Sequence, residues 1–228
     1  MIIHITRHGQ PDLDGISQKI DPEIPACDPV LTELGRKQAE FLGRHLKNIG
    51  FKGIIFSSPY RRTLDTAQIA AEITGSKIIL EKAIQEYVLA DGFPDFKGLD
   101  IQQIKAKYNS VDENCTLDYP WLAEGPETLK EVKIRVKPFL DHLLKSNLEE
   151  VLLVGHGASV HACKELLIPP AVMAKIKEEW NWNCSLSSYN IPENGNMTVE
   201  KLFCIKHIPE EYITSNRKLY REEAINGK

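Results

Sequence analysis

Three short apolar runs in this sequence are each followed closely by side chains that could carry out chemistry. These side chains, with the runs they follow, are Arg7 and His8 (after 2–6), Arg61 and Arg62 (after 54–56) and His156 (after 151–154). An imidazole can act as a nucleophile or as a proton donor. The planar guanidinium of arginine matches the oxygen atoms of a phosphate group. If these side chains share one site, that site should bind an anion, and phosphate is the anion that fits it best.

The elements that must bring these side chains together are short buried strands. Residues 2–6, 54–56, 78–80 and 151–154 are apolar and rich in β-branched side chains, which is typical of buried strands. Helical patterns separate these strands, and such alternation indicates a mostly parallel α/β sheet that is covered on both faces. Ligands bind beyond the carboxyl ends of the strands in such sheets, so we expect the histidines and arginines in one crevice.

Ser58 and Pro59 open the segment that carries the two arginines. Serine is a common N-cap, and proline is favoured at the first helical position. We therefore expect a helix over residues 59–74 that is capped by Ser58. The N-terminus of that helix should add a partial positive charge to the anion site.

Composition and charge exclude several classes of protein. The chain has 228 residues, of which 42% are hydrophobic and 26% charged, and it shows no internal repeat. A single domain over residues 1–228 is therefore expected, with a core that needs no disulfides. The net charge is −4 and no broad basic stripe is visible, which argues against nucleic acid as a partner.

The sequence also gives no sign of a membrane or secretory protein. No apolar run approaches the roughly 18 to 20 residues of a membrane span, and no signal peptide is recognisable. The five cysteines are widely spaced and form no C-x-x-C pair. This pattern argues against a disulfide scaffold or a zinc site, and it favours a cytoplasmic location.

Four stretches of the sequence resemble the histidine phosphatase superfamily, which includes the phosphoglycerate mutase-like phosphatases. The stretches are residues 5–10, 31–39, 57–67 and 154–157, which follow the order and the approximate separations of the family. The resemblance covers about residues 2–165, and the strands expected after that point are compatible with it. It implies a three-layer α/β sandwich of the phosphoglycerate mutase-like type.

The resemblance also implies a role for each side chain. His8 would be the nucleophile that accepts the phosphoryl group, and His156 would donate to that group. Arg7 and Arg62 would clamp the phosphate oxygens; Arg62 matches the family spacing and Arg61 does not. Fixed cationic donors can stabilise the charge of phosphoryl transfer without a metal, so no metal and no other cofactor is expected.

The general acid is the residue for which the sequence leaves alternatives. Glu86 stands where the family usually places its acid, shortly after the third strand. The stretch that follows departs from the common family pattern, and it looks more like the ecdysteroid-phosphate and Sts-type branch. Asp91 and Asp95 remain rival acids, and Glu86 could instead be a surface carboxylate.

The function implied is that of a metal-independent phosphatase that hydrolyses phosphate monoesters through a phosphohistidine. One alternative is a phosphoglycerate mutase-type phosphotransferase, and another is a weakly active module that binds a phosphorylated ligand. The partner would be a small phosphorylated substrate or a phosphoprotein, and a homodimer is compatible with the sequence. Specificity is expected from residues 10–30 and from a lid over residues 86–125.

Two further expectations concern these variable parts of the chain. The pocket is expected to be walled by aromatic side chains of the lid, namely Phe93, Phe96, Tyr119 and Trp121. Residues 206–228 read as a polar tail.

Overall fold

The computed structural model describes residues 1–87, 96–122, 125–176, 180–193, 196–215 and 218–219. A six-stranded sheet forms its centre, in the order β3-β2-β4-β1-β5-β6. The strands are β1 (Ile2–Arg7), β2 (Ile54–Ser57), β3 (Ile78–Leu80), β4 (Glu150–Gly155), β5 (Leu186–Asn190) and β6 (Thr198–Cys204). The four strands from β3 to β1 run parallel, and β5 is antiparallel to β1 and to β6. The expected mostly parallel α/β fold is confirmed.

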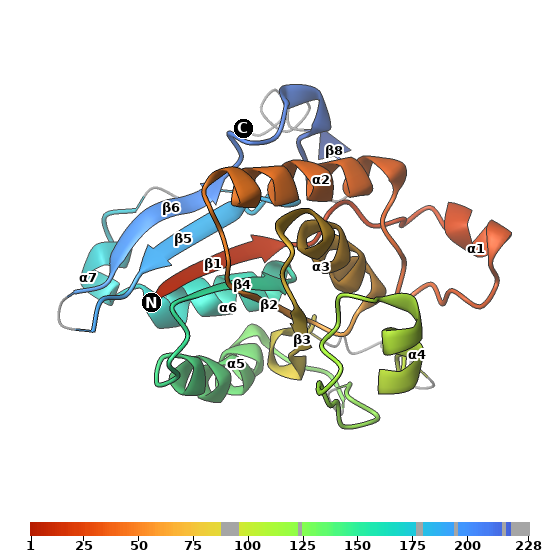
Figure 1. Ribbon diagram of the computed structural model, residues 1–228, viewed down its shortest axis with the longest axis horizontal. Helices are drawn as coiled ribbons and strands as arrows, with labels where there is room; N and C mark the ends of the chain where they lie inside the picture. Colours follow the sequence, from red (N-terminus) through yellow and green to blue (C-terminus); the bar gives the residue numbers. More distant parts are fainter. Residues whose placement is uncertain (88–95, 123–124, 177–179, 194–195, 216–217, 220–228) are drawn as a thin grey trace.

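Two pairs of long helices cover the two faces of the sheet (Figure 1). Helices α2 (Glu33–Asn48) and α3 (Arg61–Thr74) pack together on one face, and α5 (Leu129–Leu143) and α6 (Gly157–Leu167) pack together on the other. The shorter elements are α1 (Ile16–Ile20), η1 (Lys82–Ile84), α4 (Ile101–Lys107), α7 (Pro170–Met173), η2 (Glu210–Tyr212), β7 (Thr214–Ser215) and β8 (Lys218–Leu219).

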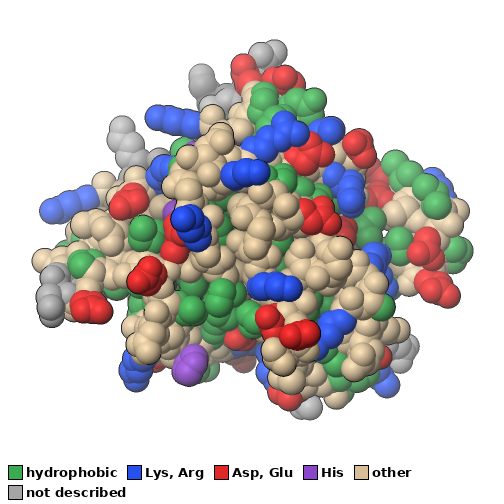
Figure 2. Space-filling view, in the orientation of Figure 1, with side chains coloured by type: hydrophobic (Ala, Val, Ile, Leu, Met, Phe, Trp, Pro, Cys, Tyr) green, Lys and Arg blue, Asp and Glu red, His purple; other side chains and the backbone are tan. Residues whose placement is uncertain are grey.

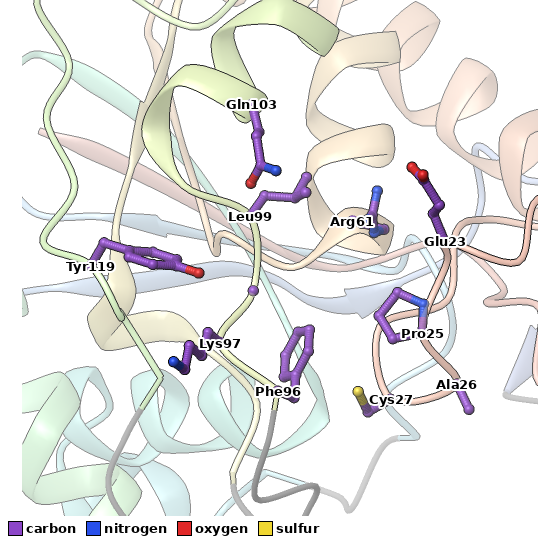
Figure 3. Close-up of a pocket in the computed structure, with 11 residues that line it drawn as sticks. Glu23, Pro25, Ala26, Cys27, Arg61, Phe96, Lys97, Leu99, Gln103 and Tyr119 are labelled. Atoms are coloured by element: carbon purple, nitrogen blue, oxygen red, sulfur yellow. The ribbon is translucent and has the colours of Figure 1, made fainter.

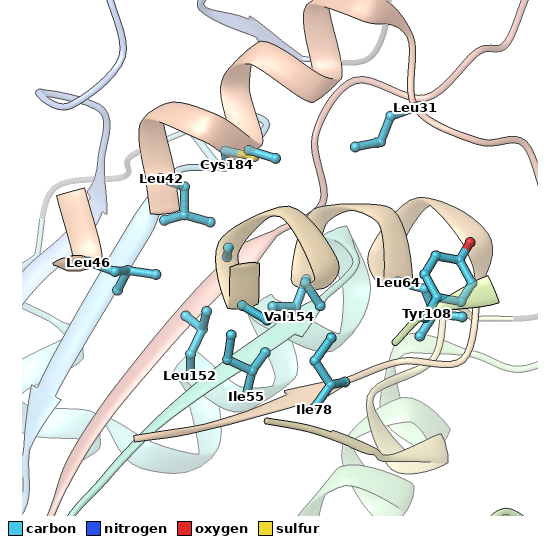
Figure 4. Close-up of a cluster of buried hydrophobic side chains, with 14 of the residues drawn as sticks. Leu31, Leu42, Leu46, Ile55, Leu64, Ile78, Tyr108, Leu152, Val154 and Cys184 are labelled. Atoms are coloured by element: carbon cyan, nitrogen blue, oxygen red, sulfur yellow. The ribbon is translucent and has the colours of Figure 1, made fainter. Parts of the chain in front are cut away.

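Each face of the sheet has its own hydrophobic core. Successive side chains of a strand point to opposite faces. In β4, Leu152 therefore packs with Leu42 and Leu64 on the α2–α3 side (Figure 4), whereas Leu153 packs with Val136 on the α5–α6 side. Burial on both faces explains why β4 reads as an uninterrupted apolar run.

The loop after β1 packs directly against the start of α2. Thr32 caps α2 by accepting a hydrogen bond from the Gly35 N–H at 3.0 Å. A Cβ atom added to Gly9 would lie 2.5 Å from the carbonyl oxygen of Gly35. Only glycine permits this approach, which anchors the backbone immediately after His8.

The helix that carries the arginines begins later than expected. Helix α3 starts at Arg61, its N-cap is Tyr60, and no side chain of that residue caps it. The expectation that Ser58 is the cap is wrong, because the Ser58 hydroxyl bonds to His156 instead. The first amide of the helix donates to Asp28, so a carboxylate already occupies the positive end of α3 that was expected to face the ligand.

Two irregular regions lie against the edges of this framework. In the described part of residues 86–125, Val111 forms a parallel bridge to Ile78, so this segment runs beside the outermost strand, β3. The expected polar tail contains two buried apolar residues, Ile208 and Ile213, which join the core on the α2–α3 side. The part of that tail which the structure describes therefore belongs to the packed molecule.

The surface carries charges of both signs. In the view of Figure 2, lysine and arginine side chains alternate with aspartate and glutamate, and no continuous basic stripe crosses the described residues of that face. Within the described part of the chain, no helix combines the length and apolar character needed to cross a membrane.

Candidate active site

The strand register brings the three groups of side chains to one edge of the sheet. Arg7 at the end of β1 pairs with Gly155 at the end of β4, and Ser57 at the end of β2 pairs with Val154. The backbone N–H of His8 continues this ladder by donating to the Gly155 carbonyl at 3.0 Å. The crevice expected at the carboxyl ends of these strands is therefore present, and it brings together Arg7, His8, Arg62, Glu86 and His156.

His8 is held in a form that suits a nucleophile. Its side chain is buried, and Nδ1 lies 2.7 Å from the carbonyl oxygen of Gly9. A carbonyl only accepts, so Nδ1 carries the proton and the lone pair is left on Nε2. Burial lowers the pKa of His8 well below its usual value, and the positive charges of Arg62 and Arg7 lower it further. The imidazole is thus neutral at neutral pH, and its lone pair is available for attack.

His156 faces His8 across the site. The two ring centroids are 5.2 Å apart, with an angle of 61° between the planes. Nε2 of His156 lies 2.9 Å from the Ser58 hydroxyl, and Nδ1 lies 3.7 Å from a carboxylate oxygen of Glu86. Burial lowers the pKa of His156 well below its usual value, with Arg62 as the next cause.

The C-terminal part of the chain holds Arg7 in place. One guanidinium nitrogen, Nη1, donates to the Asn181 carbonyl at 3.0 Å and to the Ser215 hydroxyl at 3.2 Å. Asn183 adds a side-chain hydrogen bond of 2.9 Å to the carbonyl of His8. These residues fix the end of β1 from behind, which leaves less conformational entropy to lose when an anion binds.

Arg62 and Arg61 point to different places. Arg62 lies on the first turn of α3, only 8% exposed, with its guanidinium 4.5 Å from the centre of the Tyr60 ring. Its Nη2 lies 4.0 Å from Glu86, so it faces the crevice. Arg61 turns away and places Nε 3.5 Å from Asp28. The structure therefore turns Arg62 toward the crevice between the histidines and Arg61 toward Asp28.

Glu86 lies at the rim of the same crevice. Oε1 accepts a hydrogen bond from the Tyr87 N–H at 3.2 Å, and Oε2 faces His156 and Arg62. The carboxylate is about a quarter exposed, with a relative side-chain accessibility of 26%. A carboxyl group in this position can exchange protons both with solvent and with a group bound between the histidines. The rival acids, Asp91 and Asp95, lie outside the described residues.

The turn before Glu86 is fixed by a residue that sequence reasoning missed. Arg135 of α5 donates through Nη1 to the carbonyls of Ala83, at 2.6 Å, and Gln85, at 3.3 Å. Its Nε pairs with Glu127 at 2.7 Å. Because Arg135 bridges α5 to this turn, the position of Glu86 is set by the core of the molecule.

A pocket of about 480 Å³ opens above these side chains. Four of the site residues line it, namely Arg7, His8, Arg62 and Glu86. The other lining residues are Pro11, Leu13, Ala26, Cys27 and Pro29 from the loop after β1, and Tyr87, Gly157 and Ala158. A second pocket of about 530 Å³ adjoins it and shares Ala26 and Cys27 as a wall.

The aromatic side chains expected to wall the pocket have different positions. Phe96 and Tyr119 line the second pocket, on the side opposite residues 23–27 (Figure 3). Trp121 is 2% exposed and packs edge-on against Tyr60, with 5.0 Å between the ring centroids. Trp121 therefore supports Tyr60 from behind, while Phe93 lies outside the described residues.

Three of the site residues could also act as metal ligands. His8, Glu86 and His156 each offer one ligand atom, and these atoms lie within 4.8 Å of one another. Two imidazoles and a carboxylate are a common donor set for zinc. The charges of Arg7 and Arg62 bear on both histidines, however, and they favour an anion over a cation in this space. The absence of a metal requirement remains a prediction.

Sequence reasoning missed the residues that support the site from a distance. Asp28, Ser58, Asn181, Asn183 and Ser215 are all nearly or fully buried polar side chains. The sequence predicted Ser58 only as a helix cap, and Asp28 stands three positions before one of the matching stretches. The other three have no local signal, because their partners stand more than 170 positions away.

Comparison with known proteins agrees with this geometry. The model of the histidine phosphatase superfamily (branch 1) matches residues 3–203. Phosphoserine phosphatase 1 of Hydrogenobacter thermophilus is 28% identical over 200 residues, which cover 84% of this chain and 89% of that protein. The phosphoglycerate mutase of Schizosaccharomyces pombe is 30% identical over 168 residues, which cover 71% of this chain and 76% of that protein.

Comparison with solved structures shows that the fold is shared as well. The ecdysone phosphate phosphatase from Bombix mori aligns with a TM-score of 0.68 at 20% identity, over 97% of this chain and 98% of that chain. This chain belongs to the histidine phosphatase superfamily. Its fold is the phosphoglycerate mutase-like fold, and its activity is that of a phosphoric monoester hydrolase.

Proposed function

We propose that His8 is the nucleophile of this phosphatase and that Glu86 is its general acid. The lone pair on Nε2 of His8 attacks phosphorus, and the bond between phosphorus and the ester oxygen breaks. Glu86 gives its proton to the departing oxygen. The observation that carries this proposal is the neutral, buried His8 with Nδ1 bound to the Gly9 carbonyl and two arginines beside it.

The second half of the reaction uses the same residues in reverse. A water molecule attacks phosphorus and gives a proton to the Glu86 carboxylate. The bond between nitrogen and phosphorus then breaks, inorganic phosphate leaves, and His8 regains its lone pair. Arg7, Arg62 and His156 donate to the equatorial oxygens throughout, where charge accumulates in the transition state.

The substrate class proposed is a small phosphorylated molecule, with a phosphoprotein as the alternative. The phosphate fits the pocket above His8, and the leaving group extends toward residues 10–30 and 86–125. The adjoining pocket supports this arrangement, because it shares Ala26 and Cys27 with the catalytic one and combines apolar walls, such as Leu99, with polar side chains, such as Gln103 (Figure 3). A relative named for phosphoserine is consistent with a small substrate.

Transfer of the phosphoryl group to a second substrate is the rival function. It is favoured by one observation, the 30% identity to a protein named phosphoglycerate mutase. The two functions share every step up to the phosphohistidine and differ only in whether water or a substrate hydroxyl accepts the group.

A turnover screen tests the proposal. Phosphorylated sugars, amino acids, nucleotides, steroids and phosphopeptides are each incubated with the protein in excess chelator, and free phosphate is measured. Release that persists in chelator is expected. Loss of release that a divalent ion restores would show that the reaction needs a metal, for which His8, Glu86 and His156 are the candidate ligands. A cytoplasmic location is part of the same proposal.

The oligomeric state is a separate question. Sedimentation of the intact protein would show whether it forms a homodimer.

A further inference from the structure

A buried carboxylate lies behind the phosphate site and has no part in the chemistry above. Asp28 belongs to the loop between α1 and α2, yet its side chain is 1% exposed. Both of its oxygens face the start of α3. Oδ1 accepts a hydrogen bond of 2.8 Å from the Arg61 N–H and lies 4.0 Å from Nη1 of Arg62. Oδ2 lies 3.5 Å from Nε of Arg61.

The first of these contacts replaces a missing helix cap. Tyr60, the N-cap residue of α3, contributes no capping side chain. Asp28 supplies the acceptor from another part of the chain, and its charge opposes the positive end of the helix. An amide oxygen could make the same hydrogen bond, so capping alone does not explain why a carboxylate is buried here.

The remaining contacts concern the guanidinium of Arg62, which is held on three sides. Asp28 lies near Nη1, Tyr60 lies under its face at 4.5 Å, and Glu86 lies near Nη2. Glu86 must gain and lose a proton during turnover, so it cannot hold Arg62 at every step. Asp28 and Tyr60 are left as the constant supports.

We propose that Asp28 is a positioning residue that holds Arg62 in the orientation that binds phosphate, and that Arg61 serves as the counter-ion of Asp28. This inference rests on the proposed function, because it assigns a purpose to the arginine that the proposed chemistry requires. It also gives the adjacent arginines separate tasks, since Arg61 acts on Asp28 and Arg62 faces the phosphate site.

Because Asp28 is charged, the direction in which its neutralisation changes the affinity for phosphate tests the inference. A negative charge beside an anion site weakens anion binding by simple electrostatics. If Asp28 only perturbed the potential, its neutralisation would tighten phosphate binding. If it positions Arg62, the same neutralisation weakens binding, because the guanidinium loses the partner that fixes its orientation.

The protonation state of Asp28 gives a second readout. Burial raises the pKa of Asp28 to about 6, although Arg62, the Arg61 N–H and the Arg61 side chain all lower it. Asp28 should therefore be ionised at neutral pH and protonated in mild acid. The other titratable groups that face it are Asp65 on α3 and, by their mutual influence, Cys27, Tyr60 and Tyr108.

The experiment compares Asp28→Asn with the wild-type protein by calorimetric binding of inorganic phosphate, which needs no turnover. The variant keeps an oxygen for the Arg61 N–H and removes the charge. At pH 7.5 we expect the dissociation constant for phosphate to rise about tenfold, a fraction of the attraction between two opposite charges 4.0 Å apart. At pH 5 we expect the two proteins to converge, because wild-type Asp28 is then protonated. The ratio between the proteins cancels the ionisation of phosphate itself.

Asp65→Asn is the matched control. Asp65 is a nearly buried acid on the same helix, but it bonds to the Leu31 N–H and the Tyr108 hydroxyl and to neither arginine. Its substitution should leave phosphate binding at pH 7.5 within about twofold of the wild type. Tighter binding by Asp28→Asn, or an equal loss at both pH values, overturns the inference.

Arg61→Ala tests the same arrangement if Asp28→Asn does not fold. It keeps the backbone N–H that binds Asp28 and removes one cation that holds the pKa of Asp28 down. In this variant, the affinity for phosphate should begin to weaken at a higher pH than in the wild type. An unchanged midpoint of this pH dependence contradicts the inference. Failure of the proposed function would appear separately, as a protein that binds phosphate as described but forms no phosphohistidine.

Discussion

The Ser58 hydroxyl and Nε2 of His156 lie 2.9 Å apart in the fully buried floor of the site. On its other side, Nδ1 of His156 faces a carboxylate oxygen of Glu86 at 3.7 Å. A carboxylate only accepts, so the tautomer with its proton on Nδ1 is favoured. The Ser58 hydroxyl then donates to Nε2. Ser58 thereby keeps a donor of His156 directed at the position where phosphoryl oxygens would lie.

Removal of this hydroxyl should lower the rate without unfolding the protein. In Ser58→Ala, His156 loses the hydrogen bond that fixes the tautomer and orientation of its ring. The value of kcat/KM should fall about tenfold, the scale of one hydrogen bond in the transition state. Steady-state kinetics measures this change. Ser57→Ala is the control, because Ser57 is equally buried and its hydroxyl bonds only to the Ser58 carbonyl among the contacts described. Equal losses in the two variants would show that Ser58 supports packing alone.

The covalent intermediate provides a direct test of His8. Rapid quenching with labelled substrate should trap phosphate on the protein in an acid-labile and alkali-stable form. His8→Ala should abolish this labelling, since Nε2 of His8 is the attacking atom. His156→Ala should still form the adduct, but slowly. Labelling that survives in His8→Ala contradicts the assignment of the nucleophile.

The two adjacent arginines should differ in their effect on the rate. Removal of a fixed donor that acts in the transition state costs about 10² to 10³ in kcat. Arg62→Ala should therefore lose about that factor, because its guanidinium faces Glu86 and the pocket. Arg61→Ala should lose clearly less, because its side chain lies beside Asp28 and the adjoining pocket and does not face the phosphate site. The rates are compared as kcat/KM at neutral pH. The opposite ranking would show that Arg61, and not Arg62, faces the phosphate.

The sequence alone was sufficient to predict the site residues that lie at the ends of strands. Arg7, His8 and His156 directly follow or end apolar runs, and parallel strands bring their carboxyl ends to one edge whatever the details of packing. Arg62 could be placed by its distance from Ser57 and Ser58 along the same local segment. Glu86 could be placed near the site, although its contacts could not.

The supporting residues could not be predicted because they act across the chain. Asn181, Asn183 and Ser215 reach Arg7 and His8 only after β5 and the segment that follows β6 have folded back onto the sheet. The start of α3 was misplaced for a related reason. Ser58 has the local preference of a cap, but a buried histidine from a distant strand takes its hydroxyl, and tertiary contacts override such preferences.

The role of Glu86 depends on the leaving group. Glu86→Gln keeps the size of the side chain and removes its proton. It should slow an alkyl phosphate about 10²- to 10⁴-fold, because the departing alkoxide needs that proton. It should slow p-nitrophenyl phosphate much less, because nitrophenolate leaves unaided. The ratio of kcat/KM for the two substrates is the measurement.

Either of two other results would change the assignment of the acid. If Glu86→Gln slows both substrates equally, the residue binds phosphate or supports the fold. If it changes neither rate, Asp91 or Asp95 becomes the leading candidate, and the same pair of substrates can be applied to Asp91→Asn and Asp95→Asn.

Acid should destabilise the folded protein, because five of its histidines are hard to protonate in place. The pKa of each is lowered by burial, and the residues are His4, His8, His45, His156 and His207. Below about pH 6.5 the unfolded chain binds more protons than the folded chain, so the free energy of unfolding decreases as the pH is lowered. Asp28 acts in the opposite direction between about pH 6 and pH 4, because its pKa is raised on folding.

His207 allows the pH dependence of the free energy of unfolding to be measured at a residue outside the active site. Burial and His45, which stacks on it at 4.9 Å, lower the pKa of His207 to about 4. Between pH 7.5 and 5.5 this residue should cost the folded state about 1 kcal/mol. Any destabilisation by His207→Asn, measured in urea, should therefore shrink by about that amount over the same interval. His142→Asn, a substitution at an exposed site on α5, is the control. A constant difference between His207→Asn and the wild type would mean that His207 is protonated as easily in the folded chain as in the unfolded one.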